Sequence, residues 1–278
     1  MIRILNIFDE QKGPLFLFLD RLGVKPLFFM QFQDTFLFSS ELKGLFAYPG
    51  NTPAIDKNSL CEIFALGPAK SYGQGVFKNT KEVLPGTFLS VSANGIQEHT
   101  YWQLKSAPHE DNFETTIEKT AFLIQDAVKM QLLSDVPVCT FLSGGIDSSI
   151  VTAVACKYMQ SHGETLNTFS FDFKENDIYF QSNSFQPERD LPYVNIMRNH
   201  YPTNHTFLEC DEMQLINALF SVVDAKDLPG MADVDASMLY FCSLVAKKNK
   251  VALTGECADE IFGGYPWFYR EELLNRDG

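Results

Sequence analysis

The stretch VPVCTFLSGGIDSS at residues 136–149 decides the fold of this chain. Residues 136–139 are short, apolar and β-branched, which predicts a buried strand. Residues 150–156 (IVTAVAC) predict a packed helix, so the two glycines lie on a tight strand-to-helix turn. A helix N-terminus presents unpaired backbone N–H groups and the positive end of the helix dipole. The turn is therefore predicted to bind an anion, and a phosphate chain in particular.

The side chains of this turn suit a phosphate chain that a metal ion bridges to the protein. Gly144 and Gly145 let the backbone approach an anion without an intervening Cβ, and Ser143 and Ser148 supply hydroxyl donors. Asp147 would repel a phosphate unless a cation joined the two, and Mg²⁺ binds carboxylate and phosphate oxygens together. The spacing differs from the GxGxxG and GxxxxGK[ST] loops. The alternative is an ordinary turn with helix-capping serines, which we disfavour because the motif is long and chemically coherent.

Two motifs carry a family resemblance. SGGIDSS resembles the pyrophosphate-binding loop of the ATP pyrophosphatases, which release AMP and pyrophosphate from ATP. VALTGECADEIFGGY at residues 251–265 is similar to a stretch of the glutamine-hydrolysing asparagine synthetases. Thr254 stands where that family usually has Ser, and Cys257 stands where it usually has Gly.

The amino-terminal third carries a third resemblance. LFLFLDRLGVKPLF at residues 15–28 and FSSELK at residues 38–43 look like the end of the glutaminase domain of the same enzymes. The resemblance implies that Asp20 holds the amino group of glutamine; the alternative is a turn residue. Such a glutaminase needs an amino-terminal cysteine, and Ile2 occupies that position. We therefore expect a chain truncated at both ends, without glutaminase activity and without a catalytic lysine of the family.

The resemblance implies a set of site residues. ATP and its pyrophosphate would be held by Leu142, Ser143, Gly144, Gly145, Asp147 and Ser148, with Phe171 beside the adenine and Thr254 and Gly255 closing the site. Glu256 would support formation of a β-aspartyl-AMP intermediate, and Asp147 and Asp259 would ligate Mg²⁺. The alternative for Glu256, Asp259 and Glu260 is a solvated acidic turn that opens a helix, where acids are favourable.

Composition narrows the classes of protein. The 278 residues suit two domains, and 45% hydrophobic with 21% charged residues indicates a globular protein. A net charge of −13 argues against a nucleic-acid groove and against adsorption to anionic membranes. No apolar run reaches the roughly 18 residues of a membrane span. The six scattered cysteines, without a CxxC pair, fit a reducing cytoplasm.

The pattern along the chain predicts two domains joined by a polar linker at 105–112. The resemblance implies that residues 1–108 are the end of an α+β amino-terminal-nucleophile glutaminase domain, and Asn94-Gly95 predicts a hairpin within it. The alternation of strands and helices predicts a parallel, doubly wound α/β sheet in residues 109–278, and the resemblance implies that this is the start of an ATP-binding domain of the ATP-pyrophosphatase type. Its strands are expected at 136–142, 166–171, 204–209 and 250–254, and its helices at 113–133, 149–161, 188–199, 212–223 and 235–248. Because ligands bind at the carboxyl ends of such strands, both motifs should face one crevice.

Other acidic residues carry weaker signals. Asp224, Asp227, Asp233 and Asp235 crowd one region, either as an acidic surface loop, which we favour, or as a substrate or metal contact. Glu188 and Asp190 are interpreted as first-turn acids of a helix, with nucleotide contact as the alternative. The five histidines form no constellation.

The expected function is glutamine-dependent asparagine synthesis, in which ATP amidates aspartate and AMP and pyrophosphate are released. One alternative is a related amidotransferase or a β-lactam-synthetase-like enzyme, and another is a non-catalytic ATP-binding fragment. The expected partners are aspartate, glutamine or ammonia, and ATP with Mg²⁺. A complementary fragment or a second copy of the chain is also expected, but no nucleic acid and no membrane.

Overall fold

The computed structural model describes residues 4–8, 13–182 and 187–275. The chain divides into two compact units. The first comprises residues 1–109 together with 219–235, and the second comprises residues 110–218 together with 236–278. The domain prediction assigned all of residues 109–278 to one ATP-binding domain, whereas residues 219–235 cluster with the first unit.

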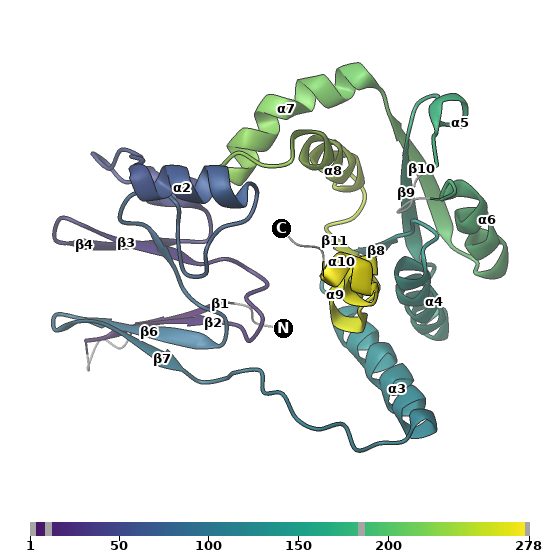
Figure 1. The fold of residues 1–278 in the computed structure, drawn as a ribbon, viewed down its shortest axis with the longest axis horizontal. Helices are drawn as coiled ribbons and strands as arrows, with labels where there is room; N and C mark the ends of the chain where they lie inside the picture. The colour runs from purple at the N-terminus through teal and green to yellow at the C-terminus, as the bar shows by residue number, and fades with distance from the viewer. Residues whose placement is uncertain (1–3, 9–12, 183–186, 276–278) are drawn as a thin grey trace. The chain divides into compact units, whose positions relative to one another are not determined.

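The first unit contains two antiparallel sheets. One has the strand order β1-β2-β6-β7, and the other has the order β4-β3-β5. The strands are β1 (Ile4–Phe8), β2 (Leu15–Leu19), β3 (Phe28–Phe32), β4 (Thr35–Ser39), β5 (Lys81–Glu82), β6 (Thr87–Ser92) and β7 (Gly95–Thr100). The predicted hairpin is confirmed, because β6 ends at Ser92 and pairs antiparallel with β7, which begins at Gly95. Figure 1 shows the two sheets stacked on each other, with α2 (Lys57–Leu66) beside β3 and β4.

Alternating side chains build the core of this unit. Leu17 and Leu19 of β2 pack with Phe29 of β3 between the two sheets. Phe28 and Met30 point to the opposite face of β3, where they pack against α1 (Leu42–Phe46). This follows from the two-residue period of a strand, which sends successive side chains to opposite faces. The unit is therefore layered as sheet, sheet and helix.

The second unit is built on a parallel sheet with the strand order β10-β9-β8-β11. The strands are β8 (Val138–Phe141), β9 (Asn167–Phe173), β10 (Asn204–Cys210) and β11 (Val251–Leu253). The chain moves outward from β8 to β9 and β10 and then returns to the other side of β8 at β11. The order of the strands therefore reverses between β8 and β11, which is where open α/β sheets bind their ligands.

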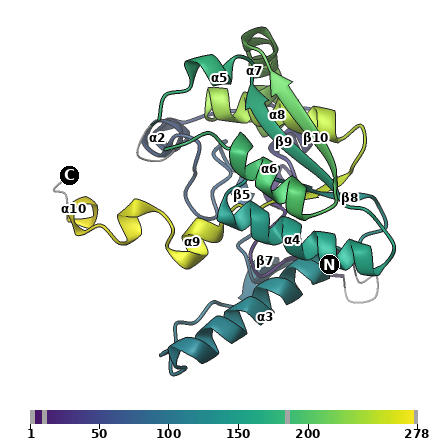
Figure 2. The ribbon, with the colours of Figure 1, turned by 90° about the vertical axis from the view of Figure 1, so that its right-hand side faces the viewer.

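Helices cover both faces of this sheet. On one face Val138 packs with Ala155 and Cys156 of α4 (Ile146–Ser161) and with Val128 of α3 (Phe113–Gln131). On the other face Cys139 and Phe169 pack with Phe241 of α8 (Ala232–Val245). Figure 2 shows α4 and α6 in front of the strands and α8 behind them. The predicted parallel α/β sheet is confirmed.

The remaining helices are α6 (Leu191–His200) and α7 (Glu212–Lys226), with short turns α5 (Asn176–Tyr179), α9 (Ala258–Phe262), η1 (Pro266–Phe268) and α10 (Glu271–Leu274). The expected helix at 149–161 begins three residues earlier, at Ile146, because Gly145 rather than a serine is its N-cap. The expected helix at 188–199 begins at Leu191, with Asp190 as its N-cap. Among the described residues, the structure holds no helix with the length and apolarity needed to cross a membrane.

Candidate functional site

The loop after β8 is closed by its own serines. The hydroxyl of Ser148 lies 3.0 Å from that of Ser143 and donates to the carbonyl oxygen of Gly145 at 3.2 Å. The backbone N–H of Ser143 donates to Ser148 Oγ at 3.3 Å. Ser148 is buried and Ser143 is exposed, so Ser148 braces the loop while Ser143 faces solvent. Leu142 is buried, and its N–H donates to Phe169 O of the neighbouring strand at 2.8 Å.

The two glycines of the loop have different surroundings. Gly144 has a φ of +87°, and a Cβ there would lie 2.6 Å from Tyr193 Cβ and 2.9 Å from Val194 N in the first turn of α6. Gly144 is therefore required by its left-handed backbone and by close packing. A Cβ on Gly145 would meet only Ser143 Oγ, at 3.6 Å, among the described atoms within 4 Å. Gly145 thus leaves open space at the N-terminus of α4, whose N-cap has no side-chain hydrogen bond.

The loop after β11 lies directly against the loop after β8. A Cβ on Gly255 would be 2.6 Å from the backbone N of Ser148 and 2.8 Å from Asp147 Cβ. This contact arises because β11 pairs with β8 in parallel, so the two strands end side by side. The structure thus brings together the two motifs that the sequence predicted to share a crevice.

The charges of two carboxylates interact near the contact of these loops. The pKa of Asp147 is raised above its ordinary value of 3.8 by burial and, next, by the negative charge of Asp259. The carboxylate of Asp259 lies against Gly264, whose N–H donates to Asp259 O at 2.9 Å. Two like charges in a partly buried place are stabilised by a bound cation.

The donor set fits a magnesium ion that also binds phosphate. The described part of the chain holds no group of three or more His, Cys, Asp or Glu side chains placed to hold a metal. Mg²⁺ is usually bound by one or two carboxylates together with substrate phosphates and waters. Asp147 in the first turn of α4 and Asp259, whose charge acts on Asp147, are the two carboxylates that could hold such an ion here.

The other residues of the second motif follow β11 in the chain. Thr254 follows β11 and is half-buried, while Glu256 is exposed. The charge of Glu256 contributes, after burial, to a raised pKa of the Cys242 thiol, which places Glu256 near α8. Cys257 has a φ of +69° at the N-cap of α9. A glycine would adopt this left-handed conformation without strain, which is consistent with the family's preference at this position.

Phe171 lies near the carboxyl end of β9. Its ring packs 4.9 Å from the ring of Phe241 and 5.5 Å from that of Phe173, so the side chain belongs to the core under α8. A contact with adenine at this position would therefore come from the backbone, and it stays a prediction.

Sequence reasoning missed the part played by the start of α6. Asp190, interpreted as a first-turn acid, is the N-cap of α6, and its carbonyl oxygen would lie 3.0 Å from a Cβ on Gly144. The preceding Arg189 pairs with Asp172 at the end of β9, at 3.4 Å. Local patterns held no signal for this, because it depends on how α6 packs against the loop after β8.

Asp20 in the first unit organises a turn. Its Oδ1 accepts the N–H of Leu22 and its Oδ2 accepts that of Val24, both at 3.0 Å. Its carbonyl oxygen also accepts the N–H of Gly86 at 2.9 Å. The described contacts thus show the turn function, and the glutamine contact stays a prediction.

Comparisons with known proteins show the family of the chain. Residues 119–278 match the family described as asparagine synthase, and residues 2–102 match a glutamine amidotransferase domain. The chain is 46% identical over 268 residues to asparagine synthetase [glutamine-hydrolyzing] 3 of Bacillus subtilis, covering 96% of this chain and 44% of that protein. It is 33% identical over 267 residues to a putative asparagine synthetase [glutamine-hydrolyzing] 2 of Methanocaldococcus jannaschii, covering 93% of this chain and 48% of that protein.

Among solved structures, the glutamine-dependent NAD+ synthetase of Acinetobacter baumannii, in complex with ADP, aligns with a TM-score of 0.34 and 14% identity, over 64% of this chain and 31% of that chain. The chain spans less than half the length of the two curated relatives given above. The family match covers more than half of the chain and includes both loops of the site. The chain belongs to the asparagine synthase family.

Proposed function

We propose that this chain is part of a glutamine-hydrolysing asparagine synthetase, and that its second unit binds ATP on a fold of the ATP-pyrophosphatase type. The observation that supports this most is the contact of Gly255 with Asp147 and Ser148. This contact lies where the strand order reverses, beside the N-terminus of α4, and it involves Asp147, whose pKa is affected by the charge of Asp259.

The proposed nucleotide contacts follow the two loops and the end of β9. They are Leu142, Ser143, Gly144, Gly145, Asp147, Ser148, Phe171, Thr254 and Gly255. The backbone N–H groups at the start of α4 would face the phosphate chain, because that end of a helix attracts anions. Asp147 and Asp259 would hold Mg²⁺, which supplies positive charge where phosphate oxygens gather.

In the proposed reaction, a side-chain oxygen of aspartate attacks the α-phosphorus of ATP, and the bond from that phosphorus to pyrophosphate breaks. Both reactants are anionic, so the protein must offset their repulsion and stabilise pyrophosphate as it leaves. The N-terminus of α4 supplies fixed N–H dipoles for this purpose. Glu256, exposed beside the second loop, is proposed to support formation of the β-aspartyl adenylate.

Ammonia would then attack the activated acyl carbon, and AMP would leave as asparagine forms. In the whole protein, the glutaminase-type unit would supply ammonia from glutamine, with Asp20 proposed to hold the amino group of glutamine. We propose a cytoplasmic location, and a complementary segment or a second copy of the chain as partner.

The test uses the two products of the proposed cleavage. An enzyme that cleaves between the α- and β-phosphates accommodates AMP and magnesium pyrophosphate together in the space that ATP fills. We expect each product to displace labelled ATP from the chain, and each to leave room for the other. Displacement by ADP and phosphate as a pair, with none by pyrophosphate, would contradict the proposal. Pyrophosphate release that depends on aspartate, rather than on glutamate, would identify the acceptor.

A further inference from the structure

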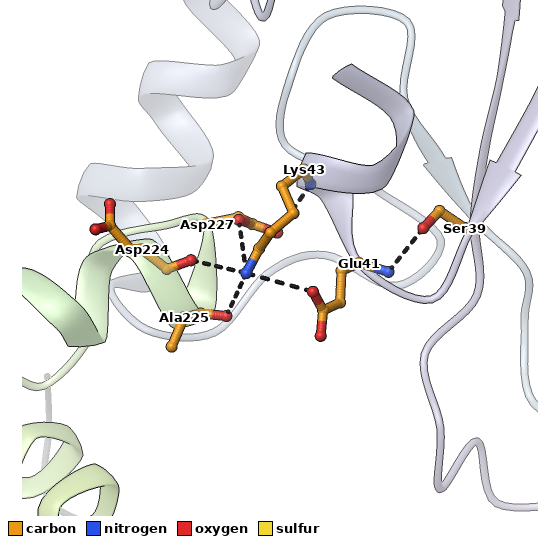
Figure 3. Close-up of polar contacts among 6 residues, drawn as sticks. All are labelled: Ser39, Glu41, Lys43, Asp224, Ala225 and Asp227. Atoms are coloured by element: carbon orange, nitrogen blue, oxygen red, sulfur yellow. Dashed lines mark hydrogen bonds and ion pairs between the residues drawn. The ribbon is translucent and has the colours of Figure 1, made fainter. Parts of the chain in front are cut away.

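Lys43 and Asp227 cap each other's helices within the first unit. The ammonium group of Lys43 donates to the carbonyl oxygens of Asp224 at 2.7 Å and Ala225 at 3.2 Å, in the last turn of α7 (Figure 3). In return, the carboxylate of Asp227 accepts the backbone N–H of Lys43 in the first turn of α1, at 3.0 Å. An ion pair of 3.3 Å joins the two side chains. Helix ends leave such backbone carbonyl and N–H groups unpaired. We call this arrangement the Lys43–Asp227 cap.

The backbone conformation of Asp227 indicates that this position needs the carboxylate for its contact with α1. Asp227 follows the last residue of α7 and has a φ of +63°. This position after a helix is usually glycine, because other residues are strained there. The Asp227 side chain is only 12% exposed, against 44% for Lys43. The contact with the N–H of Lys43 in α1 explains why an aspartate with a largely buried carboxylate occupies a position where its backbone is strained.

The segment after Asp227 is held at further points. Leu228 packs against the cluster that contains Phe28 and Leu42. Asp235 pairs with Lys226 at 2.8 Å and accepts the N–H of Met231 at 2.8 Å. The connection between α7 and α8 is therefore held by contacts with other segments of the first unit and by contacts between its own two ends.

The same connection leads directly into the nucleotide-binding unit. Residues 219–235 belong to the first unit, whereas the rest of α8 belongs to the second. On α8, the ring of Phe241 packs 4.7 Å from that of Phe141 and 4.9 Å from that of Phe171. Phe141 is the last residue of β8, directly before the loop that leads to Asp147 in the first turn of α4. One continuous helix thus runs from the capped segment to the strands that carry the site.

We propose that Lys43 is a positioning residue for the nucleotide site, acting through Asp227 and α8. The expected effect on ATP affinity rests on the proposed function, whereas the expected effect on the structure of residues 224–235 and of the strand ends does not. The cap fixes the entry to α8, and α8 in turn supports the ends of β8 and β9 through Phe241. Residues of the glutaminase-type sequence would in this way affect the loops that hold ATP.

Hydrogen exchange of the ligand-free full chain tests the structural part. We expect Lys43→Met to raise exchange in peptides covering 224–235 at least tenfold. We expect a smaller rise, about threefold, in peptides covering 139–143 and 169–173. Asp227→Asn should act in the same direction, because Asn tolerates a positive φ but removes the charge. Lys43→Arg, which keeps the charge and several donors, should restore most of the protection.

Asp56→Ala is the matched control. Asp56 caps α2 in the same unit, where its carboxylate accepts the N–H of Ser59 at 3.0 Å, and it takes no part in the Lys43–Asp227 cap. Its loss destabilises a helix of the same unit without touching residues 219–235. We expect no selective change at 139–143 in this variant. Unchanged exchange at 224–235 in Lys43→Met, or the same pattern in Asp56→Ala, would overturn the proposal.

Nucleotide affinity separates this proposal from the proposed function. We expect Lys43→Met and Asp227→Asn to weaken binding of Mg²⁺·ATP about three- to tenfold, and Asp56→Ala to leave it unchanged. If the wild-type chain bound no ATP, the proposed function would fail while the exchange data still decided the role of Lys43. If ATP bound equally well to all four proteins, the positioning role would be refuted with the proposed function intact.

Discussion

Asp147 in the first turn of α4 and Asp259 in the first turn of α9 follow different strands, yet the charge of Asp259 helps to raise the pKa of the Asp147 carboxyl. Without a bound cation, these two side chains repel each other where the loops meet. The site is therefore arranged for a ligand at the expense of the stability of the ligand-free chain.

Asp147→Asn should stabilise the ligand-free chain. Burial and Asp259 raise the pKa of Asp147 above 3.8 in the folded state, so the folded chain holds this proton more tightly than the unfolded chain. Below pH 3.8 both states are protonated and no penalty exists; the penalty develops as the pH rises through the folded pKa. We expect a gain of roughly 0.5–1 kcal/mol at pH 7, the scale of close charge pairs near a surface, measured by urea unfolding. Asp126→Asn, at an exposed position of α3, is the control, and a less stable Asp147→Asn would contradict the explanation.

Two glycine substitutions should have different effects. Gly255→Ala places a Cβ 2.6 Å from a backbone nitrogen, so we expect a loss of about 1–3 kcal/mol in unfolding free energy together with loss of ATP binding. Gly145→Ala meets only a side-chain oxygen at 3.6 Å, so its unfolding free energy should fall by about 1 kcal/mol or less. ATP binding should nevertheless weaken in Gly145→Ala, because the methyl group enters the space predicted for phosphate. Calorimetric titration and urea unfolding of both variants check this, and normal ATP affinity in Gly145→Ala would argue against the placement.

Cys257→Gly should increase stability by about 0.5–1 kcal/mol. Cys257 has a φ of +69°, and a left-handed conformation costs a residue with a Cβ roughly 1–2 kcal/mol. Part of that gain is offset by the greater freedom of glycine in the unfolded chain. Cys257→Ala keeps the Cβ and should show no such gain, so equal stabilisation by Ala and Gly in urea unfolding would disprove the backbone explanation.

His205 should make stability fall in mild acid. Its ring nitrogens lie 2.9 Å from the hydroxyls of Thr168 and Ser170, and burial, with the charge of Arg198, lowers its pKa from 6.5 to about 4. The folded state therefore favours the neutral ring, and the stability it contributes is complete above pH 6.5. That stability is lost as the pH falls from 6.5 to about 4, by roughly 1–2 kcal/mol after allowance for solvent exposure.

The measurement for His205 is urea unfolding at pH 7 and pH 4.5. The wild type should lose more stability between these values than His205→Gln, which carries no titrating ring. Identical losses in both proteins would show that this histidine does not contribute to the pH dependence.

Much of the second unit was predictable because its signals are local. The apolar run 136–139, the glycines after it and the alternation of strands and helices fix a parallel sheet. The proximity of Asp147 and Asp259 followed from the rule that the carboxyl ends of parallel strands share one edge. The helix expected from residue 149 begins three residues earlier as α4, at Ile146, because Gly145 is its N-cap.

Short elements and contacts between distant segments could not be predicted from the sequence. α9 has five residues, too few to show a helical period. Nothing local connects Lys43 with Asp227, and nothing local indicates that residues 219–235 cluster with the first unit. The same holds for Gly144, whose close neighbour is the first turn of α6. For Lys43 and Gly144 the deciding contact joins segments that are far apart in the sequence.

The central claim is that the loops after β8 and β11 bind one triphosphate bridged to Asp147 and Asp259 by Mg²⁺. Its most direct test is calorimetric titration of ATP, with and without Mg²⁺, into the wild type, Asp147→Asn, Asp259→Asn and the double variant. Mg²⁺ should strengthen binding to the wild type at least tenfold, each single variant should lose most of this gain, and the double variant should lose little more. An equal gain from Mg²⁺ in the wild type and the double variant would contradict the claim.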